Sequence, residues 1–175
     1  MIADAIVSDV LVVLLPTLGA LVGAYLGVEW TARSQADREL RALTDAAAAV
    51  LARADQERGN AYVMFVQEGP NTSDRGFEAV MAFRRELSEA DQIRYRIAAC
   101  TKSGDPVFDT YAKAVDALAE VSRALGTAAS SPARRRWRGG VGDLLAGLDA
   151  KMTSGETAFR QARDEFLDAA RTRFG

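Results

Sequence analysis

Residues 106–128 read PVFDTYAKAVDALAEVSRALGTA, and this stretch decides the fold class. Its apolar side chains recur every three or four residues, which is the period of one face of an α-helix. The repeating positions are Val107, Tyr111, Val115, Leu118, Val121 and Leu125. Just before them, Gly104 can end one helix, Asp105 can cap the next and Pro106 suits its first turn. The stretch therefore predicts an amphipathic helix with one buried face.

The same pattern continues on both sides of this helix. Residues 74–102 predict a helix with an apolar side formed by Phe77, Val80, Met81, Leu87, Ile93, Ile97 and Cys100. Residues 132–174 predict one long helix, with weak points at 139–140 and 153–156, and with core positions Val141, Leu144, Leu145, Leu148, Met152, Phe159, Phe166, Leu167 and Phe174. A first helix continues from residue 30 to a loop at 69–76, with Leu40, Leu43, Ala47, Val50, Leu51, Ala54, Ala61, Tyr62 and Phe65 as its apolar positions. Short connections between helices predict an all-α fold, an antiparallel bundle or long helical hairpin of about four helices.

An uncharged segment near the N-terminus has the composition of a membrane span. Residues 10–28, VLVVLLPTLGALVGAYLGV, include no charged side chain, and as a helix they would be roughly 28 Å long, close to the hydrocarbon thickness of a bilayer. Two alternatives are a buried core helix and a signal peptide cleaved near Val22-Gly23-Ala24, although aspartates stand where a signal peptide has basic residues. We expect residues 1–29 to form an N-terminal transmembrane anchor and residues 30–175 to form a helical-bundle domain.

The charges that flank this segment predict its orientation. Arg33, Arg38 and Arg41 follow it, and no lysine or arginine precedes it. Because basic residues remain on the cytoplasmic side, the pattern predicts a single-pass protein of the bacterial inner membrane. Its N-terminus would lie outside and its C-terminal domain in the cytoplasm.

Three glycines repeat at every fourth position of the predicted span. Gly19, Gly23 and Gly27 would lie along one face of the helix, where small residues allow two helices to approach closely. Glycine is also common in membrane helices without such a role. The register favours a packing face, used either in a homo-oligomer or against a membrane-protein partner.

The composition offers little for catalysis. The chain has no histidine and one cysteine, Cys100, which on an apolar helix face is typical of a small core residue. Glu86, Glu89 and Asp91 stand among arginines, as on a solvated, ion-paired helix face. We therefore expect no enzyme, no cofactor and no metal site. Residues 31–175 hold 22 basic and 21 acidic side chains, and this balance argues against nucleic acid as a partner.

The densest basic patch surrounds Trp137. It consists of Arg134, Arg135, Arg136 and Arg138. The patch is either the exposed first turn of a helix, with Trp137 in the core, or a binding site for an acidic protein. Anionic lipid is less favoured, because in an up-and-down bundle this connection lies far from the membrane and the field of lipid headgroups decays within about 8 Å.

Both ends of the chain resemble a group of proteins in layout. Residues 18–43, LGALVGAYLGVEWTARSQADRELRAL, and 158–175, AFRQARDEFLDAARTRFG, are similar to the ends of a loose group of actinobacterial and actinophage single-pass membrane proteins with an arginine- and alanine-rich cytoplasmic helical domain. The similarity is mostly compositional. It implies no activity, so no functional residue carries over.

These features together favour a non-catalytic, membrane-anchored interaction or scaffold protein. A first alternative is a phage- or prophage-type envelope effector that excludes superinfection or perturbs the membrane. A second is a small-molecule-sensing bundle that binds its ligand among Phe65, Phe77, Phe108 and Tyr111.

Overall fold

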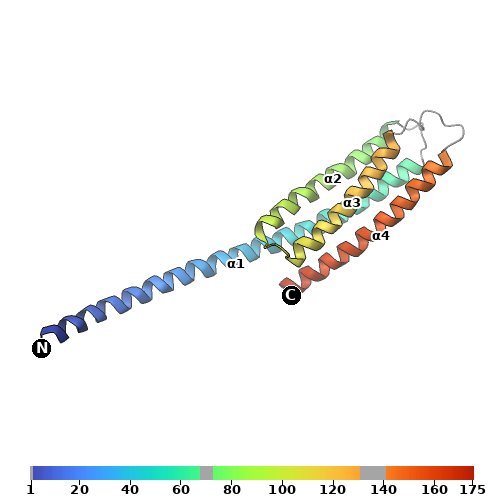
Figure 1. Cartoon of the computed structure of the whole chain (residues 1–175). Helices are drawn as coiled ribbons and strands as arrows, with labels where there is room; N and C mark the ends of the chain where they lie inside the picture. The colour runs from blue at the N-terminus through green and yellow to red at the C-terminus, as the bar shows by residue number, and fades with distance from the viewer. Residues whose placement is uncertain (1, 68–72, 131–140) are drawn as a thin grey trace. The chain divides into compact units, whose positions relative to one another are not determined.

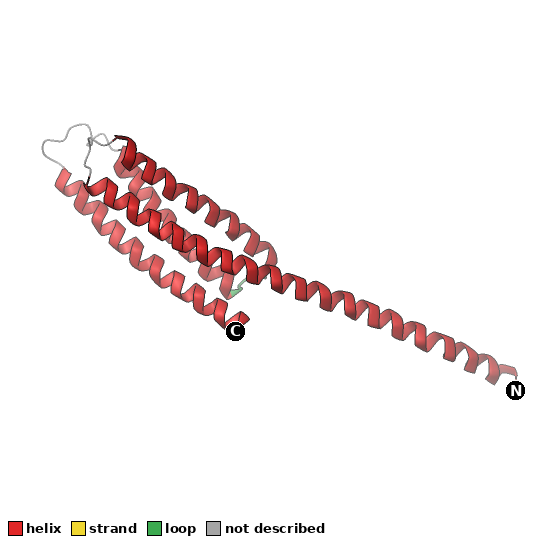
Figure 2. Ribbon diagram, turned by 180° about the vertical axis from the view of Figure 1, so that it is seen from behind, coloured by secondary structure: helices red, strands yellow, loops and turns green. Residues whose placement is uncertain are grey.

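The part of the chain that the structure describes is helical apart from a turn at 101–105 and the last residue (Figure 2). The computed structural model describes the backbone of residues 2–67, 73–130 and 141–175, and the side chains of residues 24–64, 66, 75–128 and 146–175. The helices are α1 (Ile2–Gln67), α2 (Ser73–Cys100), α3 (Pro106–Ser130) and α4 (Val141–Phe174). These ranges contain no strand, so the predicted all-α class is confirmed. The expected weak point at 153–156 lies inside uninterrupted helix, whereas the one at 139–140 falls outside the described residues.

The chain divides into two units, Met1–Glu39 and Leu40–Gly175. The described part of the first unit is the N-terminal portion of α1. Among the residues that the structure describes, no helix is sufficiently long and apolar to cross a membrane. The side chains of residues 10–23 lie outside the described set. The span at 10–28 and the domain boundary after residue 29 therefore stay predictions.

Within Leu40–Gly175, the four helices lie side by side as a bundle (Figure 1). Each helix contacts two neighbours in the order α1, α2, α3, α4. Arg53 of α1 forms ion pairs with Glu86 and Glu89 of α2 at 2.9 and 2.8 Å. Arg94 of α2 pairs with Asp116 of α3 at 2.8 Å. Between α3 and α4, the aromatic side chains of Tyr111 and Phe166 are in contact. Between α1 and α4, Arg58 forms an ion pair with Glu156, so the four helices form a closed arrangement.

Neighbouring helices run antiparallel, as the short connections predict. Along α1, the side chains of Asp55, Arg58 and Tyr62 bond to residues of α4 whose numbers fall as those of α1 rise. Those α4 partners are Arg163, Glu156 and Asp149. Antiparallel neighbours joined by short loops are the expected topology of an up-and-down bundle.

The turn before α3 has the predicted chemistry. Gly104 has a φ of 78°, a left-handed conformation that glycine adopts without steric cost. The Asp105 carboxylate accepts a hydrogen bond from the backbone N–H of Val107 at 3.0 Å, which caps the N-terminus of α3. Its other oxygen bonds to Arg173 of α4, so the cap also fastens the last turn of the chain. The predicted cap is confirmed.

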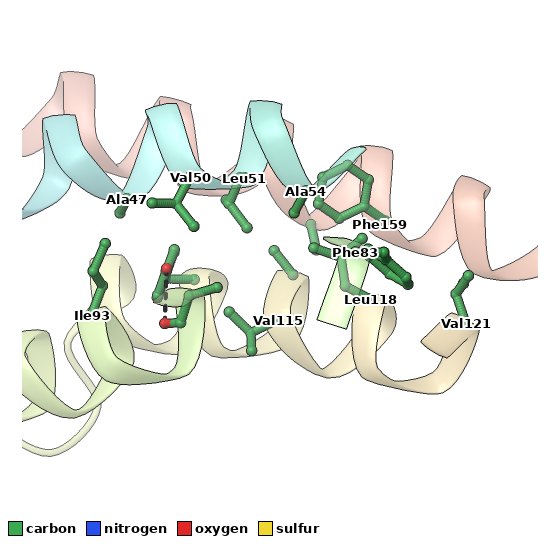
Figure 3. Packing of buried hydrophobic residues seen from close by; sticks show 14 of the residues in the cluster. Ala47, Val50, Leu51, Ala54, Phe83, Ile93, Val115, Leu118, Val121 and Phe159 are labelled. Atoms are coloured by element: carbon green, nitrogen blue, oxygen red, sulfur yellow. Dashed lines mark hydrogen bonds between the residues drawn. The ribbon is translucent and has the colours of Figure 1, made fainter. Parts of the chain in front are cut away.

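All four helices supply the core (Figure 3). On α1 and α3 the predicted apolar positions are buried, apart from Tyr62, which is half-buried, and Phe65, whose side chain is not described. Ala47 of α1 lies opposite Ile93 of α2, and Leu51 of α1 points toward Val115 of α3 (Figure 3). On α4, Leu148, Met152, Phe159 and Phe166 are buried as predicted, and Leu167 and Phe174 pack at the edge.

The predicted face of α2 is partly wrong. Phe77 and Met81, expected in the core, have 59% and 42% of their surface exposed. Two residues absent from the prediction, Phe83 and Ala90, are fully buried instead. Three residues span about 300° of an α-helix, which is about 60° less than a full turn. Residues 77, 80 and 83 therefore lie on successively different sides of the helix, and Phe83 faces the core when Phe77 does not. The helix therefore has two apolar stripes, and the core accepts one.

Candidate interaction surfaces

The predicted glycine face is described only at its C-terminal end. Gly27 lies in the described part of α1, and a Cβ added there would meet no other atom within 4 Å. Gly19 and Gly23 fall outside the residues whose side chains are described. Gly27 therefore has the open surface that a packing face needs, and the predicted face as a whole stays a prediction.

Large apolar side chains surround α1 next to Gly27. Their exposed fractions are 69% for Tyr25, 57% for Leu26, 70% for Val28 and 75% for Trp30. At about 100° per residue, these four positions cover roughly 200° of the helix circumference. A helix that packs on one side of a protein shows an apolar stripe about half as wide. The large apolar side chains of this segment are therefore spread over more than half of its circumference, and the exposed ion pair of Glu29 and Arg33 lies on the same arc toward the C-terminal side.

The predicted basic patch cannot be placed. Arg134, Arg135, Arg136 and Arg138 all fall outside the described residues. The patch therefore stays a prediction.

The carboxylates that stood out in the sequence are engaged by arginines. Glu86 and Glu89 both bind Arg53, whose pKa is raised by these two hydrogen bonds. Asp91 lies 3.9 Å from Arg94. The expected ion-paired face is thus present, but the cation at its centre comes from α1, which the local pattern of α2 could not reveal. In the described part of the chain, no group of three or more cysteine, aspartate or glutamate side chains could hold a metal ion.

The residues expected to line a ligand site do not gather in one cavity. Phe77 is exposed, whereas Tyr111 is fully buried and donates a hydrogen bond to the carbonyl oxygen of Ala90 at 3.0 Å. Burial raises the pKa of the Tyr111 phenol. Phe108 packs against the edge of the core, and Phe65 is not described. Cys100, which the sequence predicts as a small core residue, is a half-buried free thiol beside the core.

A shallow groove of about 690 Å³ runs between α3 and α4. Small residues line much of it, among them Ala117, Ala124, Ala150, Ser154, Gly155 and Ala158. A Cβ at Gly155 would overlap Cγ2 of Val121 on α3, so glycine is needed for the two helices to approach this closely. The small residues of the groove are accounted for by helix packing.

The described surfaces of the bundle and of α1 differ in their side chains. Among the described residues, ion pairs join neighbouring helices at Arg53, Arg58 and Arg94. The large exposed apolar side chains lie on the N-terminal part of α1, at the end of α1 and on α2. No protein-family model matches the chain, and no curated protein or solved structure is significantly similar to it.

Proposed function

We propose that the protein is a non-catalytic, membrane-anchored interaction protein. Residues 10–28 lie in the bacterial inner membrane as a single span, the N-terminus lies outside, and the bundle Leu40–Gly175 offers a docking surface in the cytoplasm. The chain assembles with a second copy of itself, or with another membrane protein, through the face of Gly19, Gly23 and Gly27. No biochemical reaction is part of the proposal.

One observation carries it: the apolar belt of Tyr25, Leu26, Val28 and Trp30 on α1. Moving one such side chain out of water is worth about 2 kcal/mol, so leaving all four exposed costs several kcal/mol. Because the belt covers roughly 200° of the circumference, a partner on one side would leave part of it in water. A lipid environment covers every side at once. Tyr and Trp are also the residues enriched where a span leaves the hydrocarbon, and Arg33, Arg38 and Arg41 follow at once.

The anchor is tested by fractionation of the full chain in bacterial cells. We expect the protein in the membrane fraction, resistant to carbonate extraction. Leu18→Arg places a charge inside the span and should release the chain into the aqueous fraction. Ala36→Arg, which adds the same charge to an exposed position beyond the span, should leave the chain in the membrane. Wild-type chain recovered from the aqueous fraction with its N-terminus intact would refute the anchor.

Orientation and assembly need two separate readouts. In a Cys100→Ser background, Ala36→Cys should react with a membrane-impermeant maleimide only after the cells are permeabilised. For assembly, Gly23→Leu should reduce chemical crosslinking of the chain in membranes by at least tenfold, because the leucine side chain separates the helices. Leu21→Phe changes bulk on the opposite side of the helix and should leave the crosslinked species unchanged. A monomeric wild type without a captured partner would remove the glycine face from the proposal.

A further inference from the structure

The solvent side of α2 has an unusual composition. We name as the α2 outer face the exposed residues opposite its core stripe, which are Phe77, Met81, Arg85, Ser88, Gln92, Tyr95 and Arg96. Tyr95 is 75% exposed and Phe77 is 59% exposed, so two aromatic rings and one methionine stand in solvent on a helix whose other side is fully packed. The face extends over about 27 Å from Phe77 to Tyr95, or five helical turns.

The charge of the α2 outer face is positive. Within the described residues, neither Arg85 nor Arg96 forms an ion pair, although acidic side chains lie nearby along α2. Those acids have other partners, because Glu86 and Glu89 bind Arg53 and Asp91 lies beside Arg94. Arg84 leans over α3 against Gly126, and Glu78 is the exposed acid at the edge of the face. The guanidinium groups of Arg85 and Arg96 therefore have no ion-pair partner among the described residues, although Glu89 lies one helical turn from Arg85.

We propose that the α2 outer face docks an amphipathic helix of a partner protein whose contact side carries carboxylates. The inference rests on the proposed function, since it names the surface with which the bundle would act. Tyrosine, phenylalanine, methionine and arginine are the residue types enriched in protein–protein interfaces. Each guanidinium can hold a carboxylate through two parallel hydrogen bonds, while Phe77 and Tyr95 provide apolar anchors at either end.

Other macromolecules fit this face less well than a protein helix. Nucleic acid is held by many phosphate contacts along a basic surface, whereas this face has two cations separated by polar and apolar groups. Residues 31–175 hold 22 basic and 21 acidic side chains, and this near balance provides no general attraction for a polyanion. A helix with two or three carboxylates on its contact side matches both the number of cations and the length of the face.

Site-specific photocrosslinking tests the proposal in the full chain, expressed in its native host. A benzoylphenylalanine side chain replaces Tyr95, and the control position is Glu120 on α3, whose side chain is 70% exposed. We expect a protein adduct at position 95 and at least tenfold less at 120. Mass spectrometry should map the adduct to a partner segment with helical spacing of carboxylates. The double substitution Arg85→Glu and Arg96→Glu should lower its yield at least tenfold, and Arg85→Gln with Arg96→Gln should lower it less.

Other results overturn the proposal. These are an adduct to lipid, nucleic acid or a second copy of the chain, equal yields at both positions, no adduct at position 95, or an adduct that survives charge reversal. Both arginines are exposed, so the variants should keep the wild-type unfolding midpoint by circular dichroism; if the glutamate variant unfolds, the glutamine variant alone decides. Loss of the adduct from a chain that stays membrane-bound and sensitive to Gly23→Leu would remove this surface and leave the anchor. An adduct at position 95 of a chain recovered from the aqueous fraction would keep this surface and refute the anchor.

Discussion

Arg58 lies in the most buried ion-pair network of the described bundle. Its side chain is only 8% exposed, between α1 and α4. Its guanidinium meets the Asp55 carboxylate at 2.8 Å and the Glu156 carboxylate at 3.4 Å. Both acids are more exposed than Arg58, at 23% and 33%, and each has a second cation, Arg163 beside Asp55 and Arg160 beside Glu156. The network is therefore asymmetric, with one buried cation held by two acids that have alternatives.

This asymmetry predicts that substitutions at the two ends of the Arg58–Asp55 contact change the free energy of unfolding by very different amounts. Arg58→Met removes the buried charge together with its desolvation cost, and it keeps an apolar stem of similar length. Both acids stay partly hydrated. We therefore expect the free energy of unfolding to change by no more than about 1 kcal/mol. Asp55→Ala leaves the Arg58 charge buried with one partner at 3.4 Å. Breaking a buried pair in this way costs about 3–5 kcal/mol, and because Glu156 remains we expect about 2–3 kcal/mol.

Urea unfolding of the full chain, followed by circular dichroism at one pH and one protein concentration, separates the two cases. With a slope of about 2 kcal/mol per molar urea, Asp55→Ala should lower the midpoint by roughly 1–1.5 M, and Arg58→Met by less than about 0.5 M. The double variant should resemble Arg58→Met alone, since no buried charge is left to strand. If Arg58→Met loses as much stability as Asp55→Ala, the contact is a net stabilising ion pair and the reasoning is wrong.

Three further predictions use the same urea measurement. Tyr111→Phe should lose about 1 kcal/mol with its hydrogen bond. Because the native pKa of Tyr111 is raised, the unfolded chain holds fewer protons than the native chain above pH ~10, and the free energy of unfolding falls as pH rises through that range. The free energy of unfolding of the Phe variant should therefore fall less steeply than that of the wild type between pH ~8 and ~10.5. Equal pH dependence of the two proteins would contradict this prediction. Gly155→Ala should destabilise by about 1 kcal/mol, because overlap with α3 outweighs the gain in helix propensity, whereas Gly147→Ala, with no atom within 4 Å, should stabilise by about 0.5–1 kcal/mol. Phe83→Ala should cost about 3–5 kcal/mol and Phe77→Ala less than about 0.5, and a reversed order would show that the core stripe of α2 is misplaced.

The elements that the sequence predicts well are those whose signals are local. The start of α3 depends on Gly104, Asp105 and Pro106, which are consecutive, and the structure places Asp105 and Pro106 in the predicted roles. Gly104 does not end the preceding helix, because α2 ends at Cys100 and Gly104 provides a left-handed position in the turn that follows. The core stripe of α3 repeats at every third or fourth position, and Phe108 is the one large apolar residue of this helix outside it, so the pattern favours a single face. In both cases, a few neighbouring residues contain all the information that the local structure needs.

Contacts between helices could not be read in this way. Arg53 binds Glu86 and Glu89 across 33 and 36 residues, and the register that aligns them depends on how α1 and α2 pack. Periodicity gives the face of each helix but not its offset along a neighbour. For the same reason, the sequence identified the arginines and carboxylates of α2 as an ion-paired face and missed the cation at its centre. The predicted glycine and arginine sites fall largely or wholly outside the described residues and have no structural outcome.

The error in α2 and the proposed docking face concern the same residues. Phe77 and Met81 are apolar enough to belong to a core, and they were assigned to it because a sequence pattern counts apolar residues before it knows how many the core can hold. A four-helix core takes about one stripe per helix, and on α2 that stripe runs through Val80, Phe83 and Ala90. Phe77 and Met81 add nothing to the packing of the core, and the docking proposal assigns them, together with Arg85 and Arg96, a use outside the bundle. Under the docking proposal, the residues at which apolarity and burial disagree are those with which α2 acts outside the bundle.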